Sequence, residues 1–304
     1  MIISRERPRR RPRPIGFRRN VIAVSGVSVF MGTHRRLGEY RLLDEIGRGS
    51  TAIVHLALDA QGREVAVKEL CPQVAGEPEA LARLARELAV QARVNSRYVA
   101  RLLDGRMSAE RPYVVMQYVP GCPLNALVTA YGPLTGDRLV RFARRLALAV
   151  ADVHDAGVLH RDVSPGNVIV LGDRPTLIDF GISHQEGMEQ ITRRGMVVGT
   201  PAYLAPELIE GERATTASDA FSWAATAAFA ATGRPPFGRG SLHGVCFRIL
   251  RGQADLDGVP EPLLGVVRRA LARDPADRPT ARWIAGALAQ SDDAITPRGR
   301  FAAA

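Results

Sequence analysis

The stretch HRDVSPGN at residues 160–167, followed after an apolar run by LIDFG at residues 177–181, decides the fold of this 304-residue chain. Two carboxylates, Asp162 and Asp179, and the carboxamide of Asn167 each stand beside a short apolar segment that is typical of a buried strand. Carboxylate and amide oxygens suit a hard cation such as Mg²⁺, which keeps waters and bridges phosphates. Asn167 and Asp179 are therefore candidate metal ligands, and Asp162 is left to lie beside a substrate hydroxyl.

A single lysine stands upstream of this stretch. Lys68 ends the strand-like segment VAVK at residues 65–68, and strand alternation places it on the same face as Ala66. A small side chain beside an ammonium leaves room for a flat ring with a charged tail. The other 40 of the 41 basic residues are Arg. Because ammonium and guanidinium groups differ in shape and hydration, this exception favours a specific contact over an ordinary surface lysine, which is the alternative.

A carboxylate partner for Lys68 is expected on the next segment. Residues 77–94 carry leucines at helical spacing and arginines on the other faces, which predicts an amphipathic helix. Glu87 lies one residue off the apolar stripe and is the candidate partner. The alternative is a surface glutamate paired with Arg83, four residues earlier.

Glycines mark a turn between two predicted strands in IGRGSTAIV, residues 46–54. Gly47 and Gly49 would let the backbone approach a phosphate closely, where a Cβ atom would collide. Ala52 stands where the third glycine of a G-x-G-x-x-G motif would be, so an ordinary hairpin is the alternative. A Rossmann site is disfavoured because no helix opens after the second glycine.

The chain divides into a strand-rich part and a helical part, and Pro and Gly in PGCPL at residues 120–124 mark the boundary. Short β-branched runs predict strands in the first part, around the one amphipathic helix. These strands are expected at 40–50, 51–60, 63–70, 99–107 and 111–119. Helices are expected at 136–156, 217–232, 261–273 and 280–290, the second of them apolar almost all round and therefore buried.

The charge of the chain is concentrated at its start. The net charge is +10, but residues 1–36 hold ten Arg and one acid, Glu6, so the other residues sum to about neutral. A globally basic nucleic-acid-binding surface is disfavoured, and no specific nucleic acid is expected as a partner. Binding of anionic polymers or membranes by the Arg-rich segment is a further alternative.

The three cysteines, Cys71, Cys122 and Cys246, are far apart and form no C-x-x-C pair. They support neither a disulfide framework nor a zinc site, which favours a reducing, cytoplasmic location. No stretch is apolar over the length that a transmembrane helix needs. Residues 1–38 are expected to be a disordered extension, with Met31 as the alternative start of the natural chain.

These motifs, in this order over about residues 40–290, resemble those of protein kinases, and most of all the bacterial eukaryotic-type (Hanks-type) serine/threonine protein kinases. The resemblance also rests on Gly-Thr-Pro-Ala-Tyr at 199–203 and Ala-Pro-Glu at 205–207. It implies an α+β, two-lobed fold, with a small β-sheet lobe carrying one helix and a larger, mainly helical lobe. The kinase domain would cover residues 39–291, with the lobes divided at residues 119 and 120, and residues 292–304 would form a C-terminal tail.

The resemblance also implies the cofactors and the site residues. ATP would bind with Mg²⁺, or Mn²⁺ as the alternative, held by Asn167 and Asp179, while Asp162, Lys68 and Asn167 would be catalytic. The implied ATP-binding residues are Ile46, Gly47, Arg48, Gly49, Ser50, Thr51, Ala52, Ile53, Val54, Ala66, Lys68, Glu87, Met116, Gln117 and Val119. Met116 would be the gatekeeper, and the backbone of Gln117 and Val119 would meet adenine.

Three further residues are implied to be structural. Glu207 would pair with Arg278, and Asp219 would brace the catalytic loop. Thr200 favours Ser and Thr hydroxyls of proteins as substrates. Thr192 is the candidate for autophosphorylation, for which a dimer is one option, and an unmodified threonine is the alternative.

The sequence departs from the family at the catalytic loop. Most bacterial relatives carry Lys two residues after the catalytic Asp, where this chain has Ser164. Gln91 also stands where the family usually has an apolar residue. Losing a cation beside developing charge costs about 2.7 to 4 kcal/mol, by analogy with an oxyanion donor. The alternative function is therefore an ATP-binding pseudokinase or a weakly active scaffold.

Overall fold

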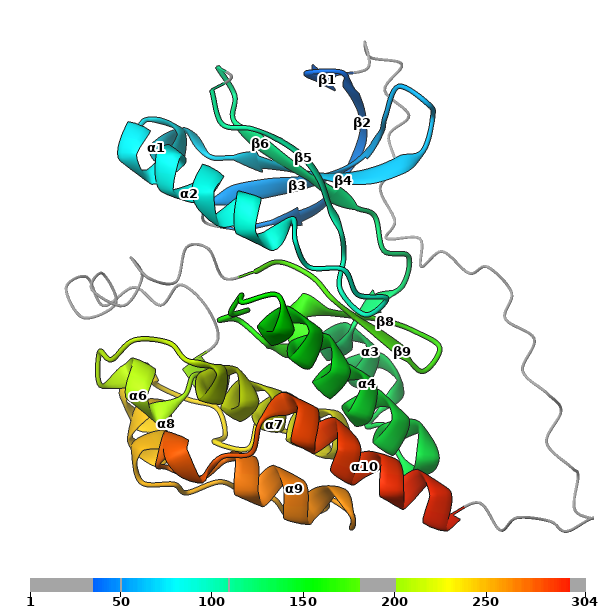
Figure 1. Ribbon diagram of the computed structural model, residues 1–304, viewed down its shortest axis with the longest axis vertical. Helices are drawn as coiled ribbons and strands as arrows, with labels where there is room; N and C mark the ends of the chain where they lie inside the picture. Colours follow the sequence, from blue (N-terminus) through cyan, green and yellow to red (C-terminus); the bar gives the residue numbers. More distant parts are fainter. Residues whose placement is uncertain (1–34, 50, 109, 181–200, 296–304) are drawn as a thin grey trace, which may run out of the picture. The chain divides into compact units, whose positions relative to one another are not determined.

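The computed structural model describes residues 35–49, 51–108, 110–180 and 201–295. Its first part is an antiparallel sheet with the strand order β1-β2-β3-β4-β6-β5 (Figure 1). The strands are β1 (Arg36–Leu37), β2 (Tyr40–Arg48), β3 (Ala52–Leu58), β4 (Glu64–Leu70), β5 (Leu102–Arg106) and β6 (Tyr113–Gln117). Between β4 and β5 the chain forms α1 (Pro72–Ala75) and α2 (Pro78–Gln91). The predicted strand-rich lobe with its amphipathic helix is confirmed.

Side-chain alternation along β4 gives this sheet two packed faces. Val65 and Val67 belong to the core on the outer face of the sheet. Leu70 points the other way and packs with Leu84 and Leu88 of α2. Residues two apart on a strand share a face, so the single lysine of the chain lies on the face that α2 covers.

Two described elements, β1 and α10, extend beyond the bounds that the sequence predicts. Strand β1 lies inside the expected 1–38 extension but pairs with β2. Leu37 is 4% exposed and belongs to the outer-face core, so burial of this side chain holds β1 on the sheet. At the other end, α10 (Ala281–Ile295) continues beyond the predicted helix end at residue 290.

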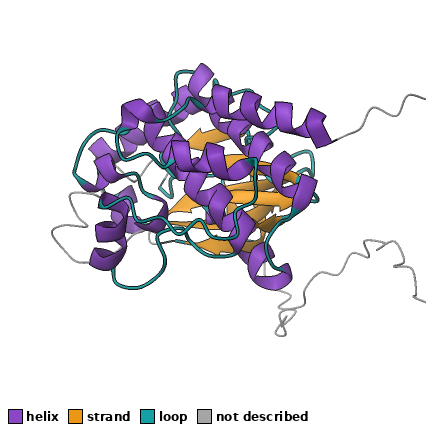
Figure 2. Cartoon of the chain, turned by 90° about the horizontal axis from the view of Figure 1, so that it is seen from below, coloured by secondary structure: helices purple, strands orange, loops and turns teal. Residues whose placement is uncertain are grey.

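The second part is mainly helical (Figure 2). Besides α10, its helices are α3 (Leu124–Tyr131), α4 (Gly136–Asp155), α6 (Pro206–Ile209), α7 (Thr216–Thr232), α8 (Leu242–Leu250) and α9 (Leu263–Ala270). A small sheet has the order β7-β8-β9. Its strands are β7 (Cys122–Pro123), β8 (Val168–Leu171) and β9 (Arg174–Leu177). Single 3₁₀ turns cover η1 (Pro165–Asn167), η2 (Pro201–Tyr203) and η3 (Pro275–Asp277).

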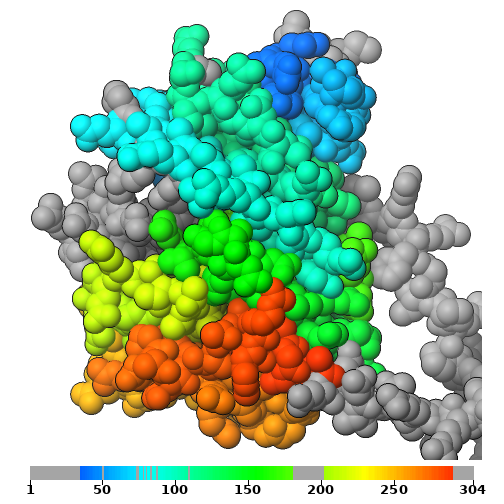
Figure 3. Space-filling model, viewed as in Figure 1, coloured from blue at the N-terminus to red at the C-terminus, as the bar shows by residue number. Residues whose placement is uncertain are grey.

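Helices α4 and α7 form the centre of this part. Every residue of the stripe predicted for α4 is fully buried, namely Leu139, Phe142, Leu146, Val150 and Val153. Helix α7 is buried from Ser218 to Ala231, and its alanines allow close approach of α4 and α9. Helix α10 packs along α4 (Figures 1 and 3). The prediction that 217–232 is a helix buried on every side is confirmed.

Main-chain hydrogen bonds tie β9 to the segment that follows α2. The N–H of Leu177 donates to Tyr98 O (2.7 Å), and the N–H of Ala100 donates to Leu177 O (2.9 Å). This segment leads into β5, so the end of β9, where Asp179 follows, is held against the first part of the chain. None of the helices that the structure describes combines the length and the apolar character needed to cross a bilayer.

Candidate active site

Strands β3, β4 and β6 place four of the predicted site residues on one face. Val54 lies directly opposite Lys68, and Ala66 lies directly opposite Met116. Directly paired residues on antiparallel strands share a face, and so do residues two apart on one strand. Val54, Ala66, Lys68 and Met116 therefore line the same side of the sheet, as the sequence predicts.

Lys68 of β4 contacts Asp179, which follows β9. Its Nζ donates to Oδ1 of Asp179 at 3.0 Å, across 111 residues of sequence. Each of these side chains is about a quarter exposed, so the pair is reachable from solvent. Glu87 belongs to α2, but its side chain lies outside the described residues, and its pairing with Lys68 stays a prediction.

The glycines at 47 and 49 are not required by the backbone of the turn. Neither has positive φ among the described glycines. A Cβ atom on Gly47 would meet Val54 at 3.8 Å, and one on Gly49 would meet Ala52 O at 3.7 Å, both ordinary contacts. The packing of the chain therefore does not explain these glycines, and their place beside a phosphate stays a prediction. Ser50, also predicted to bind ATP, lies outside the described residues.

Arg48, between these glycines, is held by its own strand. Its Nε donates to Glu45 Oε1 at 2.8 Å, and its Nη2 also contacts this carboxylate. Both side chains are largely exposed. The hydrogen bonds from Arg48 lower the pKa of Glu45. The Arg48 guanidinium thus pairs with Glu45 in this structure, and the contact of Arg48 with ATP stays a prediction.

The segment 160–167 is organised by Asn167. The amide Nδ2 of Asn167 donates to Oδ2 of Asp162 at 2.6 Å and to the main-chain O of Asp162 at 3.0 Å. The N–H of Asn167 donates to Ser164 O at 2.9 Å. With Nδ2 engaged, the amide oxygen is the atom of Asn167 that could hold a cation.

Two non-glycine residues of the described chain have positive φ, and both lie in the predicted catalytic motifs. They are Arg161 (φ 66°) and Asp179 (φ 50°). Such conformations cost about 1 to 3 kcal/mol each and persist where the surroundings fix them. The N–H of Arg161 donates to Asp219 Oδ1 at 2.8 Å, so Asp219 supports the strained peptide.

Asp219 of α7 accepts three hydrogen bonds although it is almost fully buried. Besides Arg161, the N–H of His160 donates to Oδ2 at 2.8 Å, and His154 Nε2 contacts the same oxygen at 2.9 Å. The predicted bracing role of Asp219 thus has a geometric basis. His154 was not predicted, because a single histidine next to the apolar stripe of α4 gives no signal in the sequence.

His160 joins the loop to the Asp179 segment. Its Nε2 contacts Ile178 O at 3.1 Å, and its ring lies 4.7 Å from the ring of Phe180. His160 is fully buried, and this burial lowers the pKa of the imidazole despite the neighbouring carboxylates. A neutral ring therefore bridges the two motifs.

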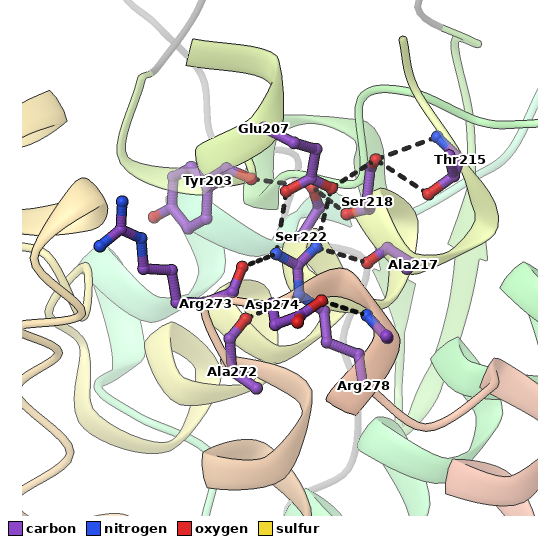
Figure 4. A network of polar contacts seen from close by, with 11 residues as sticks. Tyr203, Glu207, Thr215, Ala217, Ser218, Ser222, Ala272, Arg273, Asp274 and Arg278 are labelled. Carbon is purple, nitrogen blue, oxygen red and sulfur yellow. Dashed lines mark hydrogen bonds and ion pairs between the residues drawn. The ribbon is translucent and has the colours of Figure 1, made fainter. Parts of the chain in front are cut away.

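The predicted pairing of Glu207 with Arg278 is present and deeply buried (Figure 4). Nη1 and Nη2 of Arg278 each donate to one carboxylate oxygen at 2.8 Å. The remaining donors reach three main-chain carbonyls, those of Ala217, Ala272 and Arg273. All five N–H groups of the guanidinium are satisfied, as a buried charge requires.

The other residues predicted to bind ATP lie on or beside β2, β3 and β6. The N–H of Gln117 donates to Arg101 O at 2.8 Å, so this N–H is not available to adenine. Val119 follows β6, while Ile46, Thr51, Ala52 and Ile53 lie on or beside β2 and β3. Thr192 and Thr200 lie outside the described residues.

Residues 40–287 match the protein kinase domain family. The chain is similar to the probable serine/threonine-protein kinase PkwA of Thermomonospora curvata, with 36% identity over 82% of this chain and 34% of PkwA. It is similar to the serine/threonine-protein kinase AfsK of Streptomyces coelicolor, with 34% identity over 84% of this chain and 32% of AfsK. It thus spans about a third of the length of these relatives.

Among solved structures, the chain resembles the PknI kinase domain of Mycobacterium tuberculosis, with a TM-score of 0.66 and 26% identity over 86% of this chain and 99% of that one. The likeness covers both the strand-rich and the helical part. With the family match over residues 40–287 and with the predicted motifs brought together in space, this chain belongs to the protein kinase family.

Proposed function

We propose that this chain is a serine/threonine protein kinase, which transfers the γ-phosphoryl group of ATP to Ser or Thr hydroxyls of proteins. The observation that carries the proposal is the 3.0 Å contact between Lys68 and Asp179. It brings the phosphate-binding lysine and the metal-binding aspartate of the kinase motifs to one point. The relatives PkwA and AfsK are named serine/threonine-protein kinases, which supports the same function.

The residues present fit ATP with a divalent cation. The glycine turn leaves space that a Cβ atom would fill, and Lys68 supplies the positive charge for phosphate oxygens. In the described part of the chain, no three His, Cys, Asp or Glu side chains gather into a metal site. Asn167 and Asp179 are two oxygen ligands, and Mg²⁺ takes the rest of its ligands from water and phosphate. Bound there, Mg²⁺ or Mn²⁺ would neutralise charge on the phosphates.

Asp162 would act on the substrate hydroxyl. In the proposed transfer, the hydroxyl oxygen forms a bond to the γ-phosphorus, the bond to the ADP oxygen breaks, and the hydroxyl proton passes to Asp162. Asn167 holds the other oxygen of this carboxylate at 2.6 Å and so orients it. Alignment supplies much of the catalysis in such a loose transition state.

The proposal extends to the substrates, the location and the domain bounds of the kinase. Protein substrates with Ser or Thr follow from the proposed reaction, and Thr192 is the proposed autophosphorylation site, with a dimer as one arrangement. The three cysteines are free thiols, which fits signalling in the reducing cytoplasm. The kinase domain is proposed to cover residues 39–291.

The proposed function is tested with the purified chain, γ-labelled ATP, MgCl₂ and casein as the acceptor. We expect acid-stable label on Ser and Thr, no label when EDTA removes the cation, and loss of the label with a serine/threonine phosphatase. Binding of a fluorescent ATP analogue without any transfer of label would contradict the proposal and favour the ATP-binding scaffold.

Replacing the single lysine by arginine should impair the enzyme although the charge is kept. In Lys68→Arg the planar guanidinium cannot take the place of the compact ammonium. Loss of one charged hydrogen bond costs about 1.5 to 3 kcal/mol, so we expect kcat/KM for ATP to fall about tenfold or more. Arg63→Lys makes the reverse exchange at an exposed position before β4 and should leave kcat/KM unchanged. Equal activity of Lys68→Arg and the wild type would remove Lys68 from the proposed site.

Restoring the family's cation in the catalytic loop should speed the reaction. Ser164 is half-buried and stands two residues after Asp162, so Ser164→Lys would place an ammonium near the transferred phosphoryl group. A cation at developing charge is worth about 2.7 to 4 kcal/mol, and we expect part of it as a kcat gain of about tenfold. Ser164→Met is a control of similar length without charge. A gain shared by both variants, or absent from both, would show that charge at 164 does not limit the rate.

A further inference from the structure

Helix α7 carries three buried hydroxyl side chains besides the buried carboxylate of Asp219. Ser218, Ser222 and Thr226 are spaced four residues apart, so they lie one above another on the same side of the helix. Their exposed fractions are 1%, 5% and 0%. The sequence predicts that this helix is buried but does not predict the partners of its hydroxyl groups.

Each hydroxyl reaches a different segment of the active-site region. Ser218 Oγ donates to Glu207 Oε1 at 2.7 Å, and Ser222 Oγ donates to Tyr203 O at 2.8 Å (Figure 4). Thr226 Oγ1 donates to Val163 O at 2.9 Å. The first two contacts hold the Ala-Pro-Glu segment and the turn before it, and the third holds the catalytic loop.

The contact of Thr226 differs from the usual behaviour of threonine in a helix. A helical Ser or Thr commonly donates to the carbonyl four residues earlier. Thr232 does so on the same helix, since its Oγ1 donates to Ala228 O at 2.8 Å. Thr226 instead donates to a carbonyl 63 residues away in sequence. The hydroxyl of Thr226 therefore forms its hydrogen bond with the catalytic loop and not with its own helix.

The carbonyl that Thr226 holds belongs to the residue directly after Asp162. Val163 is fully buried, so this carbonyl has no access to water. On the other side of Asp162, the N–H groups of His160 and Arg161 are held by Asp219 of the same helix. Asp219 and Thr226 are seven residues apart, which is about 10 Å along a helix axis. Helix α7 thus forms hydrogen bonds to the loop on both sides of Asp162.

We propose that Thr226 is a positioning residue for phosphoryl transfer, acting through the Val163 carbonyl to fix the peptide that follows Asp162. The proposal rests on the proposed kinase function. Without the hydroxyl, the buried carbonyl lacks a donor, and the peptide between residues 163 and 164 is free to turn towards another one. Asn167 still holds the carboxylate and the main-chain O of Asp162, but the next peptide loses its fixed orientation. The nucleotide contacts proposed for Lys68 and Asp179 do not depend on Thr226.

The test compares Thr226→Val, which keeps the shape but removes the donor, with Thr226→Ser, which keeps the donor. For Thr226→Val we expect kcat to fall about tenfold to a hundredfold, because misplacement of a reacting group by about 1 Å has effects of this size. The KM for ATP should change less than twofold. Thr226→Ser should recover most of kcat. Thr232→Val makes the same exchange on the same helix, at a hydroxyl whose partners are main-chain groups of Ala228 and Arg234 at the helix end, and should leave kcat unchanged.

Rates are referred to folded protein, measured by thermal unfolding and by titration with a fluorescent ATP analogue. If Thr226→Val does not fold, Thr226→Ala, which also removes the hydroxyl donor, is judged by the same criterion. A normal kcat in the folded variant, or a loss that Thr226→Ser shares in full, overturns the inference. A wild-type chain that transfers no phosphate at all overturns the proposed function instead, so the two failures are distinct.

Discussion

Asp162→Asn is expected to lower kcat for phosphate transfer about 10²- to 10⁴-fold, the range found for removal of a positioned general base. The amide keeps the size of the carboxylate but cannot accept a proton from the substrate hydroxyl. Asp162 touches Asn167, whereas Lys68, the proposed phosphate ligand, pairs with Asp179. The affinity for ATP should therefore stay within about threefold of the wild type. The new amide of Asp162→Asn can gain or lose only an ordinary hydrogen bond, which is worth about 1 kcal/mol.

A matched control is available at the end of α4. Asp155 is an exposed carboxylate whose partner is the exposed Arg282, so Asp155→Asn makes the same chemical change far from the motif residues. Its kcat should equal that of the wild type. Label transfer by Asp162→Asn at the wild-type rate would show that another group accepts the proton, and it would remove Asp162 from the proposed mechanism.

Much of the architecture follows from the periodicity of the sequence. The stripe on α4 and the apolar helix at 217–232 are predictable because burial on one side, or on all sides, leaves a direct pattern. Helices α3 and α8, of eight and nine residues, are absent from the sequence predictions. Short helices next to Pro and Gly depend on tertiary packing rather than on a long periodic signal.

The candidate site was predictable in its motifs and in a few contacts, such as that of Glu207 with Arg278. Order and spacing placed Lys68, Asp162, Asn167 and Asp179 in the site, because few chemistries need those groups in that order. The contacts of His154 with Asp219 and of Thr226 with Val163 join segments about 60 residues apart, and one sequence holds no record of such pairs. The side chain of Glu87 lies outside the described residues, so its pairing with Lys68 stays a prediction.

Removing one partner of the buried Glu207–Arg278 ion pair should strongly destabilise the helical part. In Glu207→Gln, an amide N–H₂ group faces the guanidinium of Arg278, whose side chain is 0% exposed. Breaking one side of a buried pair leaves an uncompensated charge and costs about 3 to 5 kcal/mol. Ser218, which donates to Glu207 at 2.7 Å, also loses a charged acceptor. We expect this loss in the free energy of unfolding, measured by urea denaturation at pH 7.

The same pair predicts how this loss depends on pH. Burial alone would raise the pKa of Glu207, but hydrogen bonds from Arg278 and Ser218 outweigh it, and the pKa lies below its usual 4.5. A lowered pKa in the folded state stabilises the protein above the unfolded value and loses this effect as the pH falls through the folded value. The difference in unfolding free energy between wild type and Glu207→Gln should therefore be largest above pH 4.5 and shrink below it.

Asp255→Asn is the matched carboxylate-to-amide control for this effect. Asp255 and its partner Arg234 are both more than half exposed, and exposed pairs contribute about 0 to 1 kcal/mol. This variant should unfold nearly as the wild type does. If Glu207→Gln cost no more than Asp255→Asn, the pair would be stabilising only as much as any surface contact. The three hydrogen bonds from Arg278 to main-chain carbonyls would then hold that side chain in place without the carboxylate.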